Sequence, residues 1–176
     1  MKRSIKKIRN NIQKFGYHAY LVSGGDIPTF SYTIGLRNVV GKEIILAGGA
    51  YYSADAVFEI IATLARRYLR GEGINDTSFS VDQIGQFDLR PVHQSWVRQL
   101  MLGALDYYNN ETVPAVQVCP DDGHRTIDVP DMSVGFIPKS ADYDPWAQPR
   151  SPMDMMRYGC STSLFQARQQ WSTMSS

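Results

Sequence analysis

The sequence predicts an α+β fold, with a mostly antiparallel sheet of about six or seven short strands packed by two or three helices. Apolar residues alternate with polar ones in several short runs, as in strands, and recur at helical spacing in longer segments. Several connections between predicted strands have hairpin length, which argues against a regular βαβ repeat. A chain of 176 residues, 43% of them hydrophobic, is long enough to bury the core of one domain.

The first predicted elements are a helix over residues 4–15, with Ser4 as its N-cap, and a strand over residues 17–22. One side of the helix is apolar and consists of Ile5, Ile8, Ile12 and Phe15. The opposite side is basic and carries Lys2, Arg3, Lys6, Lys7, Arg9 and Lys14. A basic amphipathic helix can contact a membrane surface, RNA or an acidic partner. The narrow apolar stripe favours a solvated basic face instead.

Two strands joined by a loop are predicted next, over residues 30–36 and 43–47. In the first strand the large apolar side chains fall on one face, while Ser31, Thr33 and Gly35 fall on the other. We expect that small polar face to let a ligand or another chain approach the backbone closely. The run that begins at Glu43 is nearly continuous in its apolar character, which is typical of a strand covered on both faces.

The middle of the chain alternates helices with short strands. A strong apolar face predicts a helix that begins after Ser53 and ends near Gly71. Two strands and a turn are expected over residues 77–92, and a helix capped by Ser95 over residues 96–108. His93 precedes that helix, where a turn or capping role is favoured over catalysis. The last predicted strand covers residues 114–119.

The segment Pro120-Asp-Asp-Gly-His-Arg125 holds the densest group of reactive side chains in the sequence. Asp121 and His124 have the chemistry to move a proton or bind a divalent ion. Asp-Asp-Gly is also a strong turn signature, and a plain turn is the favoured alternative. Since no second cluster of metal ligands accompanies it, we predict no metal site. No cofactor is identified by any motif.

Charge and composition limit the classes of function. Eighteen Lys and Arg residues oppose seventeen Asp and Glu, so the net charge is +1, which disfavours nucleic acid as a partner. The two cysteines, Cys119 and Cys160, make neither a disulfide framework nor a zinc motif. No apolar run is long enough to span a bilayer, and no secretory signal is recognisable. We therefore expect a cytoplasmic protein.

Three segments resemble the bacterial domain-of-unknown-function family numbered 4262. The main one is Phe30-Ser-Tyr-Thr-Ile-Gly-Leu36, followed by the Glu43-Ile-Ile-Leu run. Gly16-Tyr17 and Gln117-Val-Cys-Pro-Asp121 with Gly123 supply the others, so the resemblance covers about residues 5–130. Lys42 and Cys119 depart from the family pattern, which has Pro and Trp there. The resemblance implies an intracellular microbial α+β domain and implies no activity.

Two functions of different classes remain open. The first is a small-molecule or nucleotide-type ligand domain, with hydrolase or transferase activity not excluded. Its pocket would lie between the Ser31/Thr33/Gly35 face and the Pro120–Arg125 loop, with Asp121 and His124 as catalytic residues. The expected ligand contacts are Tyr32, Thr33, Gln117 and Arg125.

The alternative is a protein-interaction module, such as an inhibitor or immunity factor. It would act through the basic first helix and the C-terminal tail. The domain is expected to occupy residues 1–138, with residues 139–176 forming an extended arm that contains a short helix. Self-association or a protein partner is expected to use residues 150–176.

Overall fold

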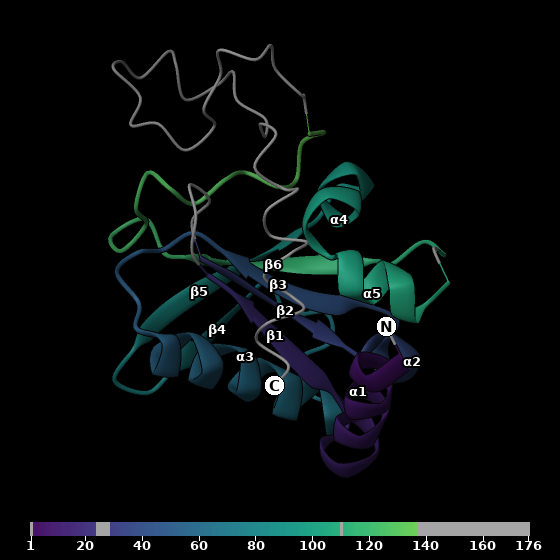
Figure 1. Cartoon of the computed structure of the whole chain (residues 1–176). Coiled ribbons are helices and arrows are strands. Elements are labelled where there is room, and N and C mark those ends of the chain that lie inside the picture. The colour runs from purple at the N-terminus through teal and green to yellow at the C-terminus, as the bar shows by residue number, and fades with distance from the viewer. Residues whose placement is uncertain (1, 24–28, 110, 137–176) are drawn as a thin grey trace.

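A computed structural model describes residues 2–23, 29–109 and 111–136 and places one six-stranded sheet among them (Figure 1). The strands are β1 (His18–Val22), β2 (Phe30–Ile34), β3 (Glu43–Ala47), β4 (Ser78–Val81), β5 (Gly85–Pro91) and β6 (Ala115–Pro120). The helices are α1 (Lys2–Phe15), α2 (Arg37–Val40), α3 (Ala54–Leu69), α4 (Gln94–Leu100) and α5 (Leu102–Tyr107). The predicted arm over residues 139–176 lies outside the described residues.

The strands lie in the order β1-β2-β3-β6-β5-β4. All neighbouring pairs in this sheet are antiparallel except β3 and β6, which run parallel with Glu43 opposite Ala115. A mostly antiparallel sheet of about six strands was predicted, and the structure confirms it. Because β3 and β6 are parallel, the loops that follow them leave the sheet at the same end of the strands.

Helices cover both faces of the sheet (Figure 1). On one face α3 packs its buried side chains against Ile44, Leu46, Val116 and Val118 of the central strands. On the other face α1, α4 and α5 pack against β2 and β3, with Tyr32 and Ile34 at the centre of that core. Burial on both sides explains why β2, β3 and β6 are buried along their whole length.

The structure corrects the predicted strand over residues 30–36. β2 ends at Ile34 because Gly35 adopts a φ of +116°, and the chain then turns into α2. The small polar face of β2 is not open to a ligand. Ser31 and Thr33 are fully buried, and Thr33 is bonded to a side chain of β3.

The predicted helix over residues 96–108 is two short helices. At the break, Met101 has a φ of −97° and a ψ of 44°. The amide of Gly103 donates a hydrogen bond to the Tyr32 hydroxyl of β2 at 3.1 Å. The helix is thus interrupted where its backbone bonds to a side chain of the sheet. Ser95 does not cap α4, since His93 is the N-cap and accepts from the Ser95 amide. Similarly, α1 begins at Lys2, which leaves Ser4 inside its first turn.

Candidate functional site

Glu43, at the start of β3, is fully buried and accepts four hydrogen bonds. The Thr33 hydroxyl donates to Oε2 at 2.6 Å. The other three bonds reach Oε1 from the amides of Gly35 and Arg37 and from the hydroxyl of Tyr108, at 2.8, 3.0 and 2.6 Å. A buried carboxyl group is costly without partners, and these four donors supply them.

The two hydroxyl groups have their directions fixed by backbone amides. Thr33 Oγ1 accepts from the Ile44 amide at 2.9 Å, and Tyr108 Oη accepts from the Gly35 amide at 2.9 Å. Each hydroxyl therefore has its single proton available for Glu43. Burial raises the pKa of Tyr108, and the nearby Glu43 raises it further, so this hydroxyl keeps its proton.

Arg37 also contacts the Glu43 cluster through its side chain. The Arg37 guanidinium lies 4.8 Å from the centre of the Tyr108 ring and forms a 2.7 Å ion pair with Glu111. Both oxygens of the buried Glu43 carboxyl group have hydrogen-bond donors. These bonds join β2, β3 and the C-terminal end of α5, which Tyr108 caps. We interpret the Glu43 cluster as a structural centre of the fold.

The reactive side chains Asp121 and His124 lie beyond the other end of the central strands, where β3 and β6 finish. Nδ1 of His124 lies 2.6 Å from Oδ1 of Asp121, and the His124 amide donates to the same oxygen at 3.0 Å. The side chains of His124 and Asp121 are 50% and 35% exposed, so a ligand can reach both. The hydrogen bond from His124 is the main cause that lowers the pKa of Asp121 from its ordinary value, which keeps the carboxylate ionised at neutral pH.

The loop over residues 48–53, after β3, lies beside the loop over residues 121–131, after β6 (Figure 1). The Ala50 amide donates to Oδ2 of Asp128 at 3.1 Å, and the Tyr51 ring centre lies 6.5 Å from that of His124. Gly48 has a φ of +76°, and a Cβ there would overlap the Asp128 carbonyl. We call these two loops the β3/β6 edge.

Arg125 is held loosely at the β3/β6 edge. Its Nη2 lies 3.3 Å from Asp122, 3.9 Å from Asp88 and 3.4 Å from the Pro120 carbonyl. Its Nε is buried and makes no hydrogen bond, and the same is true of the hydroxyls of Thr126 and Tyr52. Buried polar atoms without partners are uncommon in folded proteins. Among the described residues four side chains carry one, and three of them belong to the β3/β6 edge, the fourth being Tyr68 of α3. This edge is therefore a candidate binding site.

The predicted site residues separate into two groups. Asp121, His124 and Arg125 lie together at the β3/β6 edge. Tyr32, Thr33 and Gln117 are fully buried and engaged in the core. Gln117 donates to the Pro130 carbonyl at 2.7 Å and accepts from the Met132 amide at 3.1 Å, so it fastens the chain after β6.

The expectation of one pocket shared by both groups is wrong. Thr33 bonds to Glu43, which pairs with Ala115 at the start of β6, whereas His124 follows Pro120 at its end. Because β3 and β6 run parallel, this span is about 16 Å at ~3.3 Å per residue. The buried Thr33 hydroxyl and the exposed His124 imidazole therefore lie toward opposite ends of the central strands.

Sequence reasoning missed Tyr51 as a neighbour of His124, and Tyr52 and Asp128 as members of the same β3/β6 edge. A usable signal was present, since residues 48–53 were expected to connect a buried strand to a helix. Had β3 and β6 been recognised as parallel neighbours, their following loops would have been placed together. Glu43 was also missed, although an acidic residue that opens an apolar strand is unusual.

Cys119 is not a candidate nucleophile. It is buried at the end of β6, and burial raises its pKa to about 11. The thiol is therefore protonated at neutral pH and does not supply the reactive thiolate.

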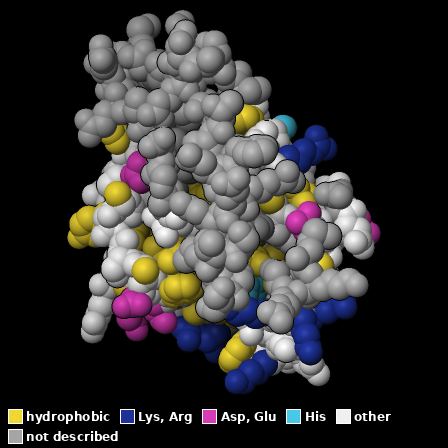
Figure 2. All heavy atoms as spheres, in the orientation of Figure 1, with side chains coloured by type: hydrophobic (Ala, Val, Ile, Leu, Met, Phe, Trp, Pro, Cys, Tyr) yellow, Lys and Arg dark blue, Asp and Glu magenta, His cyan; other side chains and the backbone are white. Residues whose placement is uncertain are grey.

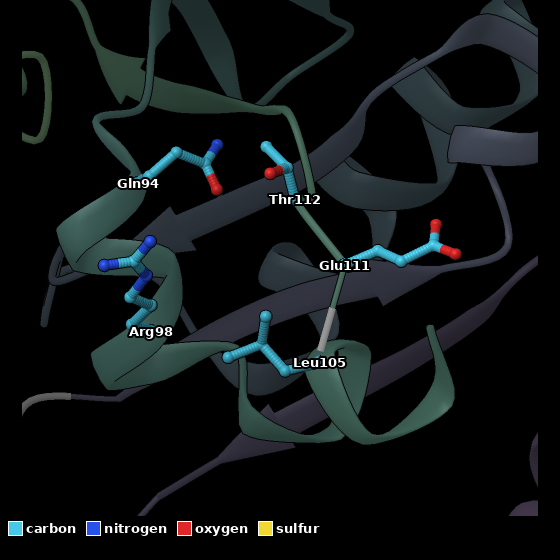
Figure 3. A pocket seen from close by; sticks show the side chains of 5 residues that line it. All are labelled: Gln94, Arg98, Leu105, Glu111 and Thr112. Carbon is cyan, nitrogen blue, oxygen red and sulfur yellow. The ribbon is translucent and has the colours of Figure 1, made fainter. Parts of the chain in front are cut away.

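Two shallow hollows lie elsewhere on the described surface. Figure 3 shows one of about 200 Å³, lined by Gln94, Arg98, Leu105, Glu111 and Thr112. Glu111 is already paired with Arg37, and Gln94 donates to the Val113 carbonyl at 2.9 Å. The second, of about 280 Å³, lies between α3 and β4. Neither contains a residue predicted for the site.

Within the described ranges, no group of three or more His, Cys, Asp or Glu side chains is arranged to hold a metal ion. In the same ranges, no helix combines the length and the apolar character needed to cross a membrane.

Comparison with known proteins gives a family but no activity. No curated protein and no solved structure matches the chain. The model of a family described as a domain of unknown function, DUF4262, matches residues 11–126, which include every strand and the Asp121–His124 pair. The chain therefore belongs to the DUF4262 family.

Proposed function

We propose that the β3/β6 edge binds a small-molecule ligand and that His124 exchanges a proton with it. The observation that carries the proposal is the 2.6 Å contact between Asp121 and Nδ1 of His124. An ionised Asp121 favours a proton on Nδ1, and Nε2 then carries the free lone pair. Nε2 has no hydrogen-bond partner among the described residues, so it is available to accept a proton from a ligand.

The position of the pair supports the same function. In sheets with parallel strands, ligands bind beyond the carboxyl ends of the strands, and the β3/β6 edge is such a place. Arg125 lies beside it with long, weak contacts, so its guanidinium can turn toward a ligand group. Proton transfer at such a site suits a hydrolase or a transferase that acts on a small or nucleotide-type molecule.

The test is native mass spectrometry of the full chain as purified, followed by identification of any bound small molecule. His124→Ala and Asp121→Ala should each lower ligand occupancy about tenfold, because each removes a charge-assisted hydrogen bond. Asp82→Ala, at an exposed turn between β4 and β5, is the matched control and should bind like wild type.

Circular dichroism and thermal melts must show that all three variants fold. The proposal is contradicted if the wild-type protein carries no small molecule. It is equally contradicted if both site variants retain the wild-type occupancy.

A protein-interaction function has one specific observation in its favour. Lys6, Lys7, Arg9 and Lys14 of α1 are exposed, and none pairs with a carboxylate among the described residues. Figure 2 shows basic side chains gathered over α1 on the lower part of the molecule. Ile8 is buried in the core, so the apolar side of α1 is already used. An acidic protein segment is the partner that fits the remaining face.

A further inference from the structure

The Tyr51 ring is the most exposed large hydrophobic side chain in the described part of the chain, at 70%. It stands nearly perpendicular to Tyr52, at an interplanar angle of 87° with ring centres 5.5 Å apart. Tyr52 is supported by Phe87 of β5, whose ring centre lies 5.7 Å away. One ring of this pair is thus fixed by the core and the other projects into solvent, and together they form a corner of two aromatic faces.

Negative charge surrounds this tyrosine corner. Asp121 and Asp128 have no Lys or Arg partner among the described residues, whereas the two cations Arg90 and Arg125 are offset by the two carboxylates Asp88 and Asp122. Asp121 bonds to His124 at 2.6 Å, and the His124 ring centre lies 6.5 Å from that of Tyr51. Burial raises the pKa of Tyr52, and the charge of Asp121 raises it further. The field at the tyrosine corner therefore favours a cation over an anion.

Aromatic faces and carboxylates together are the groups that recognise ammonium ions. The face of an aromatic ring attracts a cation through its quadrupole, and two perpendicular rings offer two such faces. We propose that the Tyr51–Tyr52 corner binds the ammonium group of an organic cation. The inference rests on the proposed function: it assigns the ligand of the β3/β6 edge to the class of amines and quaternary ammonium compounds.

The geometry also assigns different parts of the ligand to different residues of the site. The tyrosine corner holds the charged group, while His124, whose ring centre is 6.5 Å from that of Tyr51, meets another part of the same molecule. Phosphate or carboxylate ligands would approach Asp121 and Asp128 with like charge, so of the ligands in the proposed function this inference favours a small amine over a nucleotide-type molecule. A neutral apolar ligand would gain contact with the rings but no electrostatic attraction.

The probe pair is choline and its neutral isostere 3,3-dimethylbutan-1-ol, titrated separately into the full-chain protein. Binding is followed by NMR chemical-shift changes of the tyrosine ring protons. Choline should bind about fivefold or more tightly than the alcohol, because only choline carries the charge that the rings and Asp121 attract. Equal affinity, or no binding of choline, overturns the inference.

Variants locate the binding. Tyr51→Leu should weaken choline binding about fivefold, and Asp121→Asn should weaken it about threefold. Phe15→Leu is the matched control, since this ring is also exposed, at 55%, but belongs to the last residue of α1. The next residue, Gly16, lies against Leu69, at the far end of α3 from Tyr52. If Tyr51→Leu and Phe15→Leu bind choline alike, the tyrosine corner is not the site.

Different readouts separate this inference from the function on which it rests. Choline binding tests the tyrosine corner, whereas occupancy by the natural ligand in His124→Ala tests proton exchange. Loss of natural-ligand occupancy in His124→Ala with no choline binding to wild type contradicts the inference alone. Retention of the natural ligand by His124→Ala would instead contradict proton exchange and leave the choline result intact.

Discussion

At the scale of single residues, Glu43 shows how a buried acidic side chain is accommodated without a basic partner. Its four hydrogen bonds come from two hydroxyls and two amides. Arg37 contributes its amide, while its guanidinium bonds to Glu111. The stability of this arrangement depends on every hydrogen bond to the Glu43 carboxyl group being made, because removing one donor leaves a buried acceptor short of a partner.

Tyr108→Phe tests that dependence. The substitution removes one donor to Glu43 and should lower the free energy of unfolding by about 1–3 kcal/mol, the range for leaving a buried acceptor short of a partner. Urea denaturation at 25 °C measures the change. Tyr107→Phe is the control, since no hydrogen bond of that hydroxyl joins it to Glu43, and its effect should stay within about 0.5 kcal/mol. Equal losses in the two variants would show that the Glu43 bond contributes little.

At the scale of elements, α1 is joined to β1 through a buried histidine. Nδ2 of Asn11 lies 2.8 Å from Nδ1 of His18, which is 8% exposed, and the Tyr20 ring stands edge-on to it. Burial is the main cause that lowers the pKa of His18, and the charge of Lys7 lowers it further. The neutral imidazole is therefore the form that the folded state holds.

This histidine should make folding stability depend on pH. Because its pKa is lower in the folded state, the unfolded chain takes up a proton first as the pH falls below the ordinary value of 6.5. The contribution of neutral His18 to the free energy of unfolding is complete above pH 6.5 and is lost as the pH falls toward the folded-state pKa. His18→Gln should flatten the fall in unfolding free energy between pH 7.5 and pH 5.

Urea denaturation at several pH values provides the measurement. The difference between wild type and His18→Gln at pH 7.5 reports lost packing, so only the further change on acidification reports titration. Parallel pH profiles for the two proteins would show that His18 does not titrate differently in the folded and unfolded states.

The elements also explain how the β3/β6 edge is built. β3 and β6 end at the same side of the sheet because they are parallel, and the close approach of Gly48 to Asp128 brings their following loops into contact. The Ser53 hydroxyl accepts a hydrogen bond from the Ala56 amide at 3.2 Å. This cap fixes the start of α3 immediately after the tyrosine pair. The position of the tyrosine corner is thus determined by a strand pairing and a helix cap.

At the scale of the whole molecule, a net charge of +1 conceals an uneven distribution. Among the described residues, the exposed basic side chains of α1 have no carboxylate partner, and Asp121 and Asp128 at the β3/β6 edge have no Lys or Arg partner. Local fields from such patches act over about 8–10 Å at physiological salt, so each patch can select its own partner. The two candidate functions therefore use different surfaces and can be tested separately.

Charge reversal tests the basic surface of α1. Lys6→Glu combined with Lys7→Glu should weaken binding of a fluorescent poly-glutamate peptide about tenfold, and 300 mM NaCl should weaken wild-type binding as well. Fluorescence anisotropy gives the affinities. Arg66→Glu combined with Arg70→Glu makes the same change in net charge, but those cations already pair with Glu59 and Glu72, so it should have a smaller effect. Equal effects would show that only net charge matters.

Much of the fold could be predicted from local patterns. The alternation in β2, the apolar run of β3 and the apolar face of α3 each mark an element, because burial on one side imposes a period of two or 3.6 residues. His93 as a cap and the turn at Asp121 were also recognised, since both depend on neighbours within three residues. The interruption at Met101 was missed because it coincides with a contact to Tyr32 in a distant strand.

By itself, the sequence determined most of the elements and their buried faces, the family, and the acidic turn with its histidine, since these depend mainly on residues close together in the chain. Only the tertiary structure decided that Thr33 serves Glu43 in the core and that Tyr51 stands beside His124. The physical reason is strand pairing: β6 lies parallel to β3, and no local pattern states which strands are neighbours. That pairing separates the two halves of the predicted pocket and joins the two loops of the proposed site.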